Sequence, residues 1–245
     1  MRFDNKVAVV TGAASGIGRA IAIELAADGA TVAAVDRNEA GLVQTAQACA
    51  GATAHVVDLA DPAAVSTLRD EVLAAHGLPG VIVNAAGFDR VEPFMSNDDA
   101  LWQSLVAVNF LGPVRLTHAF LESILAKGET AKIVNIASDA GRVGSLGETV
   151  YAGTKGGVIA FTKSLAREMA RHQINVNCVC PGPTDTPLFD SLPDRVRDGL
   201  IKAIPFRRVA KPEEVAKAVT FFASDDASFI TGQVLSVSGG LTMAG

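Results

Sequence analysis

Short apolar runs rich in β-branched residues alternate along the chain with longer segments in which apolar residues recur every three or four positions. Such a short run is typical of a strand buried on both faces, and the longer spacing is typical of an amphipathic helix. The alternation predicts βαβ units, and hence an α/β fold with a parallel sheet covered by helices on both faces. We predict seven strands, at Val7–Val10, Thr31–Val35, Ala54–Val57, Val81–Asn84, Lys132–Ala137, Ile174–Val179 and Val234–Val237.

The helical pattern is clear near the N-terminus, where Ile17, Ile21 and Leu25 lie four residues apart. Pro62 and Pro212 stand near the starts of two other helices, where the missing N–H of a proline costs no hydrogen bond. The six predicted helices are Ile17–Ala27, Glu39–Cys49, Pro62–Ala75, Asp98–Ala126, Val150–Ala170 and Pro212–Ala223.

No proline-, serine- or glycine-rich linker interrupts the sequence, so we expect residues 1–245 to form a single domain. The 21 Lys and Arg residues are outnumbered by 26 Asp and Glu residues and form no basic cluster beyond Arg207-Arg208, which argues against nucleic-acid binding. Charges and turn residues break each apolar run before the roughly 18 residues that span a bilayer. The N-terminus shows no signal-peptide pattern, so we expect a cytoplasmic location and no membrane partner.

The three cysteines, Cys49, Cys178 and Cys180, do not form the even, spaced set of a disulfide framework. Cys178 and Cys180 alternate with Val179 in a predicted strand, so their side chains share one face, and packing is favoured over metal binding. The four histidines show no ligand-type spacing. We expect no metal in the catalytic step.

A glycine-rich turn, Thr11-Gly12-Ala13-Ala14-Ser15-Gly16-Ile17-Gly18, joins the first predicted strand to the first helix. Such a turn lets backbone N–H groups and the positive end of a helix approach a pyrophosphate. Three glycines alone also fit an ordinary tight turn. The candidate phosphate-binding residues are Gly12, Ser15, Gly16, Ile17 and Gly18.

An acidic residue, Asp36, closes the second strand eighteen residues after Gly18. A carboxylate in this position can hold both hydroxyls of an adenosine ribose and repels a 2′-phosphate, which favours NAD over NADP. Arg37 pulls in the other direction if it accepts that phosphate, but it can equally lie along the adenine or point to solvent.

Two more strand ends carry candidate cofactor ligands, because the carboxyl ends of parallel strands form the ligand edge of such a sheet. Asp58-Leu59 ends the third strand, and Asp58 can accept a hydrogen bond from the adenine amine, whereas Asp61 is the better helix N-cap. The fourth strand runs into small residues that allow close approach of a cofactor, or plain close packing: Asn84, Ala85, Ala86 and Gly87.

Tyr151, the one tyrosine of the chain, lies four residues before Lys155, so on a helix the phenol and the ammonium share a face. A phenol with a pKa of about 10 is ionised about once in a thousand at neutral pH, and a lysine one turn away favours the phenolate. Ser138 follows the fifth strand on a different element. Chance also explains this spacing, so its meaning depends on the other motifs.

Together these motifs resemble those of the short-chain dehydrogenase/reductase family, in the same order and at comparable spacing. The resemblance covers essentially all 245 residues and implies a Rossmann-type, doubly wound sheet of seven parallel strands in a single domain. N-A-A-G replaces the commoner N-N-A-G, while Asn84 is kept. The matching motifs are T-G-x-x-x-G-I-G at 11–18, Asp36, Asp58, N-A-A-G at 84–87, Asn109, Ser138, Y-x-x-x-K at 151–155 and P-G at 181–182.

The resemblance implies four catalytic residues, Asn109, Ser138, Tyr151 and Lys155. Tyr151 would transfer a proton to or from the substrate oxygen, Lys155 would lower the pKa of Tyr151 and bind the nicotinamide ribose, and Ser138 would hold the substrate oxygen. Asn109 would anchor a water that links Lys155 to solvent. The alternatives are that Asn109 only satisfies backbone groups and that Ser138 caps a strand end.

The segment after the sixth strand resembles the family's loop over the nicotinamide, at Pro181, Gly182, Thr184 and Thr186, and residues 183–209 correspond to a mobile lid over the substrate. Apolar side chains predict an apolar pocket, or ordinary lid packing: Phe88, Val91, Phe94, Val143, Leu146, Leu188, Phe189, Leu192, Ile201 and Phe206. Five cations fit either the phosphates of an acyl-CoA or a solvated face: Arg195, Arg197, Lys202, Arg207 and Arg208.

Runs around Ser138, around Pro181 and from Ser224 to Met243 resemble the 2-hydroxycyclohexanecarboxyl-CoA dehydrogenases of bacterial alicyclic and aromatic acid degradation. We therefore expect an NAD-dependent oxidoreductase that interconverts a secondary alcohol and a ketone, acting on a cyclic or aromatic hydroxy compound or its CoA thioester. The alternative is a 3-oxoacyl-thioester (ACP or CoA) reductase, and Asp36 argues against its use of NADPH. A non-catalytic dinucleotide-binding regulator is a remote alternative, because a fold does not fix a function.

The family usually assembles as tetramers, so we expect a homotetramer in which the helices carrying Asn109 and Tyr151 pack against a partner subunit. Apolar side chains on these helices fit either such an interface or their own sheet: Phe110, Val114, Phe120, Val158, Phe161 and Leu165.

Overall fold

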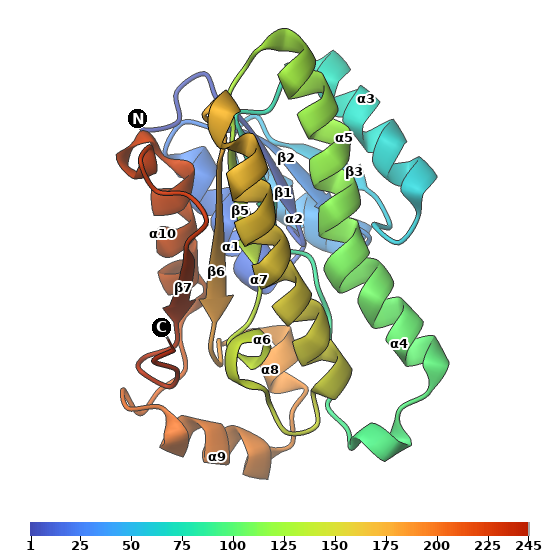
Figure 1. Ribbon diagram of the computed structural model, residues 1–245, viewed down its shortest axis with the longest axis vertical. Coiled ribbons are helices and arrows are strands. Elements are labelled where there is room, and N and C mark those ends of the chain that lie inside the picture. Colours follow the sequence, from blue (N-terminus) through green and yellow to red (C-terminus); the bar gives the residue numbers. More distant parts are fainter. Residues whose placement is uncertain (245) are drawn as a thin grey trace.

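One sheet of seven parallel strands runs through the middle of the molecule (Figure 1). The computed structural model describes residues 1–244. The strand order is β3-β2-β1-β4-β5-β6-β7, and every neighbouring pair is parallel, which confirms the predicted Rossmann-type α/β fold in one domain. The strands are β1 (Val7–Thr11), β2 (Thr31–Asp36), β3 (Thr53–Val56), β4 (Val81–Asn84), β5 (Lys132–Ile136), β6 (Asn175–Pro181) and β7 (Val234–Val237).

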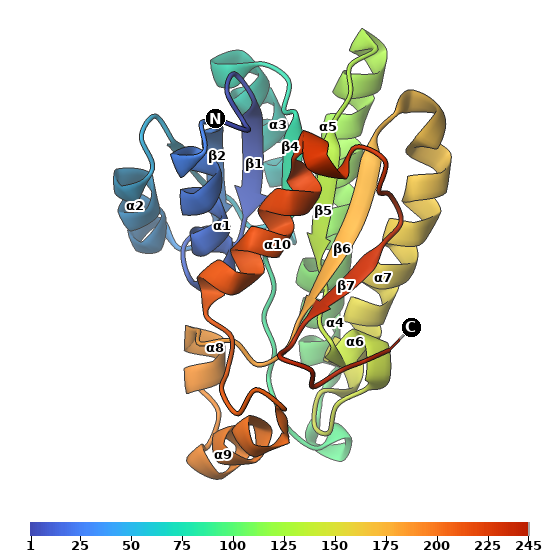
Figure 2. The same ribbon diagram turned by 90° about the vertical axis from the view of Figure 1, so that its left-hand side faces the viewer.

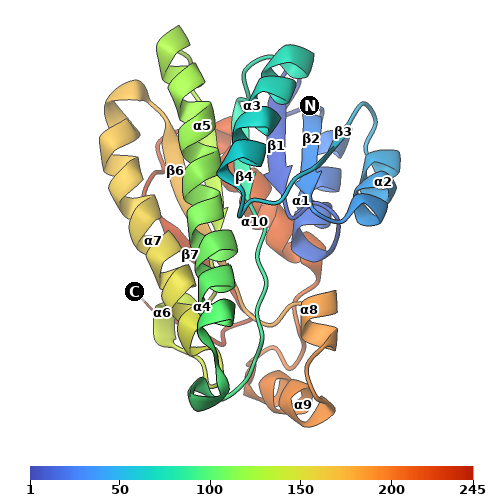
Figure 3. The same cartoon turned by 90° about the vertical axis from the view of Figure 1, so that its right-hand side faces the viewer.

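Helices cover both faces of this sheet, which explains why its strands are apolar at successive positions rather than at alternate ones. In β1, Ala8 and Val10 belong to the core on one face and Val9 to the core on the other, because successive side chains point to opposite sides. Figure 2 shows α1 (Gly16–Ala27), α2 (Glu39–Ala48) and α10 (Pro212–Ala223) on the first face. Figure 3 shows α3 (Pro62–His76), α5 (Gly112–Lys127) and α7 (Thr149–Met169) on the second.

The helices begin where short polar side chains cap them. The side chains of Asn38, Asp61 and Asp98 accept hydrogen bonds from backbone N–H groups in the first turns of α2, α3 and α4 (Asp99–Val106). Pro62 and Pro212 occupy first-turn positions of α3 and α10, as predicted. These caps fix the starting points of helices whose apolar faces then pack on the sheet.

The long helix predicted from Asp98 to Ala126 is interrupted by a π-helical turn at Ala107–Leu111, between α4 and α5. Pro113 explains the interruption, because it has no N–H to donate to the Asn109 carbonyl four residues earlier. The N–H of Gly112 instead bonds the carbonyl of Ala107, five residues back. The turn contains Asn109, whose side chain is fully buried.

The helical stretch Asp99–Lys127 is long and apolar enough to cross a membrane by length and composition, with a mean hydropathy of 1.2 in its most apolar window. Half of that window is buried inside the fold. Leu116, Phe120 and Ile124 form part of the core on the second face of the sheet. This stretch therefore uses its apolar face to pack against the domain's own strands.

The segment after β6 contains two helices that the hydrophobic pattern did not predict, α8 (Pro187–Asp190) and α9 (Asp194–Ala203). They lie beyond the ends of the strands, as does the short helix α6 (Ala140–Val143) (Figure 1). The two ends of this segment are pinned together, because Ala210 N–H donates to the Pro183 carbonyl at 3.0 Å and Asp185 N–H to the Ala210 carbonyl at 2.9 Å. Residues 185–209 therefore form a loop whose two ends are hydrogen-bonded to each other.

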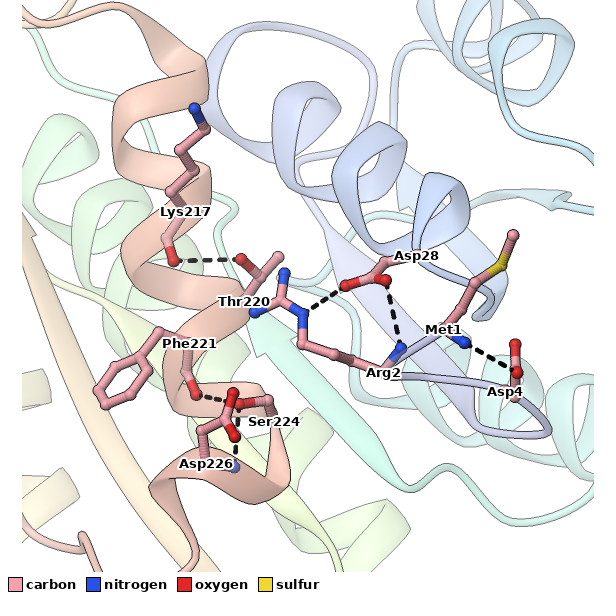
Figure 4. A network of polar contacts seen from close by, with 9 residues as sticks. All are labelled: Met1, Arg2, Asp4, Asp28, Lys217, Thr220, Phe221, Ser224 and Asp226. Carbon is pink, nitrogen blue, oxygen red and sulfur yellow. Dashed lines mark hydrogen bonds and ion pairs between the residues drawn. The ribbon is translucent and has the colours of Figure 1, made fainter.

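The amino terminus is tied down at the opposite end of the sheet, close to α10 (Figure 4). Arg2 donates to the carboxylate of Asp28 at the C-cap of α1, and this hydrogen bond holds the pKa of Asp28 below its ordinary value. In α10, Ser224 Oγ donates to the Phe221 carbonyl at 2.8 Å. These polar contacts lie at the end of the sheet that is remote from α6, α8 and α9.

Candidate active site

A cavity of about 1200 Å³ lies at the carboxyl ends of the strands. Its wall includes residues that follow each of the strands β1 to β6, together with the first turns of α7 and part of the segment after β6. In an open α/β sheet this edge is where ligands bind, because the loops that follow the strands meet there. Most of the residues singled out from the sequence line this cavity.

The turn after β1 is shaped by its glycines. A Cβ on Gly18 would lie 2.1 Å from the carbonyl oxygen of Gly12, so α1 can pass this close to β1 only with a glycine at that position. Gly12 and Gly16 have φ values of +69° and +52°, which favour glycine. Ser15 is the N-cap of α1, and within the described chain its side chain makes no capping hydrogen bond.

This turn fits the pyrophosphate of a dinucleotide. Gly12, Ser15, Gly16, Ile17 and Gly18 all line the cavity, and the first turn of α1, whose N–H groups have no partner within the helix, begins among them. A Cβ on Gly12 would meet the Ala85 carbonyl at 2.9 Å, so the turn also packs directly on the segment after β4.

Asp36 ends β2 beside the glycine-rich turn. One of its carboxylate oxygens accepts from the N–H of Ala14 at 3.1 Å and the other from the N–H of Asn38 at 3.0 Å. Asp36 and Arg37 both line the cavity. The structure thus brings a carboxylate to the place where the sequence predicts binding of the adenosine ribose.

Residues that follow the third and fourth strands, β3 and β4, also line the cavity. Asp58 and Leu59 line the cavity, and Asp58 also accepts a hydrogen bond from the N–H of Ala60 at 2.9 Å. Ala85 and Ala86 line it as well, and both donate backbone N–H bonds to the hydroxyl of Thr11.

Asn84, by contrast, lies below the cavity wall in the packed interior. Its amide nitrogen donates to Thr117 Oγ1 at 3.0 Å and to Asn135 Oδ1 at 2.7 Å. Asn135 in turn donates to Thr162 Oγ1 at 2.9 Å. These contacts make Asn84 part of a buried polar network that joins β4, β5, α5 and α7.

Tyr151 and Lys155 lie one turn apart near the start of α7, and both line the cavity. The Lys155 ammonium is buried, donates to the carbonyl of Ile136 at 3.0 Å and lies 5.7 Å from the centre of the Tyr151 ring. Ser138 follows β5 at the same edge, and its hydroxyl accepts the N–H of Ala140 at 3.1 Å. Three predicted catalytic side chains therefore meet at one wall of the cavity.

Asn109 is buried behind this wall, and its side chain is hydrogen-bonded to the backbone of Phe88, in the segment that follows β4. Its amide nitrogen donates to the Phe88 carbonyl at 2.8 Å, and its amide oxygen accepts the Phe88 N–H at 3.0 Å. A Cβ on Gly87 would lie 3.2 Å from Asn109 Oδ1 and 3.1 Å from Lys155 Nζ. Asn109 and Lys155 thus approach the same short stretch of backbone, so closely that a larger residue at position 87 would be in tight contact with both side chains.

Burial changes the acidity of both members of the pair. It raises the pKa of Tyr151 above its ordinary value, an effect opposed by a side-chain hydrogen bond with Ser138 and reinforced by the charges of Glu148 and Asp89. Burial also lowers the pKa of Lys155 to about 8, while the neighbouring Cys178, Cys180 and Asp89 raise it. In the absence of ligands, burial therefore disfavours the charged form of each side chain, yet a pKa of about 8 leaves Lys155 largely protonated at neutral pH.

The segment after β6 reaches the glycine-rich turn. Pro181, Gly182, Thr184 and Thr186 line the cavity, and a Cβ on Gly16 would lie 3.1 Å from Cγ2 of Thr186. Thr186 also caps α8, where its hydroxyl accepts the N–H of Phe189. The loop that the sequence assigns to the nicotinamide thus begins in contact with the loop assigned to the pyrophosphate.

The predicted substrate pocket is only partly assembled from the predicted residues. Within residues 1–244, Phe94, Ile201 and Phe206 do not line the cavity, whereas the other apolar candidates do: Phe88, Val91, Val143, Leu146, Leu188, Phe189 and Leu192. Among the five candidate cations, only Arg195 lines it. Arg197 pairs instead with Asp194, and Arg208 pairs with Glu214.

Four acidic residues that line the cavity were not predicted as site residues: Asp89, Glu92, Asp139 and Glu148. Asp89 lies two residues after the N-A-A-G motif, and Glu148 is the N-cap of α7 three residues before Tyr151. The sequence signal for Asp89 and Glu148 was that each carboxylate lies within three residues of a motif. Neither residue belongs to a motif itself, so a search by motif did not find them.

The chain matches known proteins along almost its whole length. The family model described as enoyl-(acyl carrier protein) reductase matches residues 12–242. A (3R)-3-hydroxyacyl-CoA dehydrogenase of Canis lupus familiaris is 40% identical over 257 residues, covering 99% of this chain and 98% of the relative. The 3-oxoacyl-[acyl-carrier-protein] reductase FabG of Thermotoga maritima is 37% identical over 247 residues, covering 99% of this chain and 100% of the relative.

The fold comparison agrees with these matches. The crystal structure of levodione reductase superposes with a TM-score of 0.93 at 30% sequence identity, and the match covers 98% of each chain. The glycine-rich turn, the parallel sheet and the wall that carries Ser138, Tyr151 and Lys155 are thus found in a chain that resembles dehydrogenases and reductases throughout. The chain belongs to the short-chain dehydrogenase/reductase family of NAD(P)-dependent oxidoreductases.

Proposed function

We propose that the protein interconverts 3-hydroxyacyl and 3-oxoacyl thioesters, using NAD. The observation that carries this proposal is the cavity wall formed by Ser138, Tyr151 and Lys155, in a chain similar to enzymes named for 3-hydroxyacyl-CoA and for 3-oxoacyl-[acyl-carrier-protein]. These relatives favour a 3-oxoacyl or 3-hydroxyacyl thioester over an unmodified alcohol as the substrate class.

The cyclic substrates expected from the sequence are a special case of the same class. In a 2-hydroxycyclohexanecarboxyl thioester, the carbon that bears the hydroxyl is two bonds from the thioester carbonyl carbon, as it is in a linear 3-hydroxyacyl thioester. A ring differs from a chain only in the shape it demands of the pocket. The half-exposed or exposed Val91, Val143 and Leu188 offer apolar contacts to either shape.

In the proposed reaction Tyr151 is the general acid/base. During oxidation the phenolate of Tyr151 accepts the proton of the substrate hydroxyl, and the hydroxyl of Ser138 holds the substrate oxygen in place. A bound nicotinamide ring supplies the acceptor for the hydride. Lys155 places its ammonium 5.7 Å from the centre of the Tyr151 ring, and a positive charge at this distance favours the phenolate.

The choice of NAD rests on Asp36. Its carboxylate faces the cavity from the end of β2 and is held there by the N–H groups of Ala14 and Asn38. A negative charge in this position attracts the ribose hydroxyls of NAD and repels the 2′-phosphate of NADP. Arg37 is the neighbouring group that opposes this preference.

A steady-state screen tests the proposal. It compares 3-hydroxybutyryl-CoA and 2-hydroxycyclohexanecarboxyl-CoA with cyclohexanol and 1-phenylethanol, each with NAD and with NADP. We expect kcat/KM with NAD to be at least about a hundredfold higher for one of the thioesters than for either free alcohol. Equal or better use of the free alcohols would overturn the thioester assignment, and higher kcat/KM with NADP would overturn the assignment of the cofactor.

A further inference from the structure

Asp89 is held over the catalytic wall by a rigid stretch of backbone. Asn109 bonds both the N–H and the carbonyl of Phe88, at 3.0 and 2.8 Å, and Gly87 passes so close to Lys155 that a Cβ would lie 3.1 Å from its Nζ. Asp89 is the next residue along this fixed stretch and lines the cavity. Its place beside Lys155 is therefore set by the fold.

The start of α7 closes on the same stretch from the other side. Glu92 N–H donates to the Gly147 carbonyl at 3.0 Å, and a Cβ on Gly147 would lie 3.1 Å from Cγ1 of Val91. The next residue, Glu148, caps α7, and its carbonyl accepts the N–H of Ala152 at 2.7 Å. Glu148 lies one turn before Tyr151, and its carboxyl is close enough to that of Asp89 for a side-chain hydrogen bond between them to raise the pKa of Asp89.

Both carboxyl oxygens of Asp89 are closed off from solvent, and neither accepts a hydrogen bond of ordinary geometry from residues 1–244; the backbone N–H of Arg90 is close enough only to lower the pKa. The neighbouring polar group is the carboxyl of Glu148, which is itself an acceptor when ionised. Two carboxylates cannot both stay ionised at such close range without a donor between them. A proton held between the two groups supplies the missing donor.

We propose that Asp89 and Glu148 share one proton and form a second acid–base unit of the active site, which acts on Tyr151 and Lys155 through its charge. The inference rests on the proposed acid–base role of Tyr151. In this unit the protonated carboxyl of one residue donates to the carboxylate of the other, so the pair carries a single negative charge. Release of the shared proton to solvent adds a second negative charge beside the catalytic pair.

The groups around the unit determine the direction of its effect. Burial and Glu148 raise the pKa of Asp89 to about 7, whereas the backbone N–H of Arg90 and the charge of Lys155 lower it. Ionised Asp89 raises the pKa of Tyr151 and also that of Lys155. The charged or titratable groups that face the unit or its partners are Arg90 on the same stretch, Glu148, Tyr151 and Lys155 on α7, and Cys178 and Cys180 on β6.

Kinetic pH profiles test the unit. The variants Asp89→Asn and Glu148→Gln keep shape and hydrogen bonding but cannot ionise, and Glu129→Gln removes the same charge from an exposed loop outside the cavity. We expect the pH at which kcat/KM for oxidation reaches half its maximum to fall by about one pH unit in both site variants, because one negative charge near Tyr151 is lost. The profile of Glu129→Gln should match that of the wild type.

The substrates for these profiles are 3-hydroxybutyryl-CoA and, in parallel, cyclohexanol. Profiles of Asp89→Asn and Glu148→Gln that superimpose on the wild-type profile would overturn the inference. If the enzyme oxidises cyclohexanol but not 3-hydroxybutyryl-CoA, and the variants still shift the pH profile for cyclohexanol, the proposed substrate class is overturned and the proposal for Asp89 and Glu148 is not. The two proposals therefore fail in different ways.

A second measurement does not depend on turnover. Because the pKa of Asp89 is raised from 3.8 to about 7, the folded protein keeps a proton that the unfolded chain releases between these values. The stability of the wild type should then fall relative to Asp89→Asn as the pH rises from about 4 to about 7, and stay parallel to it above that range. A difference in unfolding free energy that is independent of pH would contradict a shared proton, whatever the enzyme's substrate.

Discussion

Tyr151 and Lys155 respond in opposite ways to the same burial. The pKa of the phenol rises and that of the ammonium falls to about 8, so at neutral pH the ligand-free site holds a neutral phenol beside a lysine that is still largely protonated. The hydrogen bond with Ser138 opposes this tendency for Tyr151. A bound nicotinamide ribose and substrate must supply the remaining stabilisation of the phenolate, because the protein alone does not.

The acidity of Tyr151 can be measured directly, because the chain contains one tyrosine. We expect the ultraviolet absorbance of tyrosinate in the ligand-free protein to stay absent below about pH 10, the ordinary pKa of a phenol. Tyr151→Phe supplies the baseline, since it retains Trp102 and lacks a phenol. A titration with its midpoint at or below about pH 10 would show that burial does not control this group.

In the proposed preference for NAD, Asp36 discriminates between the cofactors through its charge. Asp36→Asn keeps an acceptor for the N–H of Ala14 but removes the negative charge from the cavity. We expect the ratio of kcat/KM for NADP to that for NAD to rise at least about tenfold, or about 1.4 kcal/mol. Glu39→Gln removes an exposed carboxylate at the start of α2 and should leave the ratio unchanged. An unchanged ratio in Asp36→Asn would contradict the role given to Asp36.

At the scale of elements, the site depends on how closely α1 approaches β1. Gly18 permits this approach, because any Cβ there would overlap the Gly12 carbonyl at 2.1 Å. The same strand end touches Ala85 and Ala86, so the turn after β1, the start of α1 and the segment after β4 are packed against one another. The phosphate-binding turn is thus inseparable from the packing that supports it.

Gly18→Ala should push α1 away from β1. We expect the affinity for NADH to fall at least about tenfold, with a loss of about 1 to 3 kcal/mol in unfolding free energy, the usual cost of overpacking. Gly153→Ala is the matched control, because Gly153 lies within α7 and an added Cβ there would have no tertiary contact within 4 Å among residues 1–244. That control should keep NADH affinity and gain up to about 1 kcal/mol. Normal NADH binding by Gly18→Ala would refute the packing argument.

The sequence predicted the elements whose pattern is local and missed those set by tertiary contacts. The order and type of the seven strands follow from apolar runs, and the caps Asp61 and Pro62 mark the start of α3. The π-helical turn at Ala107–Leu111 follows from Pro113, which the apolar period of the long helix conceals. Helix α9 does carry an apolar stripe, at Val196, Leu200 and Ala203, and the prediction omitted it because residues 183–209 were assigned as a whole to a lid.

The site shows the same division. The cavity gathers Ser138, Tyr151, Lys155 and Asp36, because motifs at strand ends must meet at one edge of a parallel sheet. Asn84 lies instead in a buried amide network with Thr117 and Asn135, partners that are 33 and 51 residues away. Asp89 and Glu148 come together through the packing of two loops, which no local spacing encodes.

At the scale of the whole molecule, the predicted homotetramer has a defined surface to test. Phe120 and Val158 are buried in the chain's own core, whereas Phe110, Val114, Phe161 and Leu165 remain partly exposed on α5, α7 and the π-helical turn. In the proposed interface these four residues would supply the apolar contacts, and two of them, Phe110 and Leu165, also pack against the chain's own core. Light scattering should give a mass of 4 × 25.2 kDa, about 101 kDa.

Phe161→Glu should reduce that mass to the dimer or the monomer, because it places a charge in an apolar contact. Val43→Glu makes the same kind of change at an exposed site on α2, at the other edge of the sheet, and should keep the mass of the wild type. A wild-type protein that scatters as a monomer would refute the tetramer. A tetrameric Phe161→Glu would place the interface elsewhere.

The most direct test of the central claim is the oxidation of 3-hydroxybutyryl-CoA by the wild type and by Tyr151→Phe, followed as NADH formation together with NADH binding. The account predicts turnover by the wild type, a loss of kcat of about a hundredfold or more in Tyr151→Phe, and NADH affinity within a few-fold of the wild type. A Tyr151→Phe enzyme that keeps most of its activity, with NADH binding unchanged, would contradict the assignment of Tyr151 as the general acid/base.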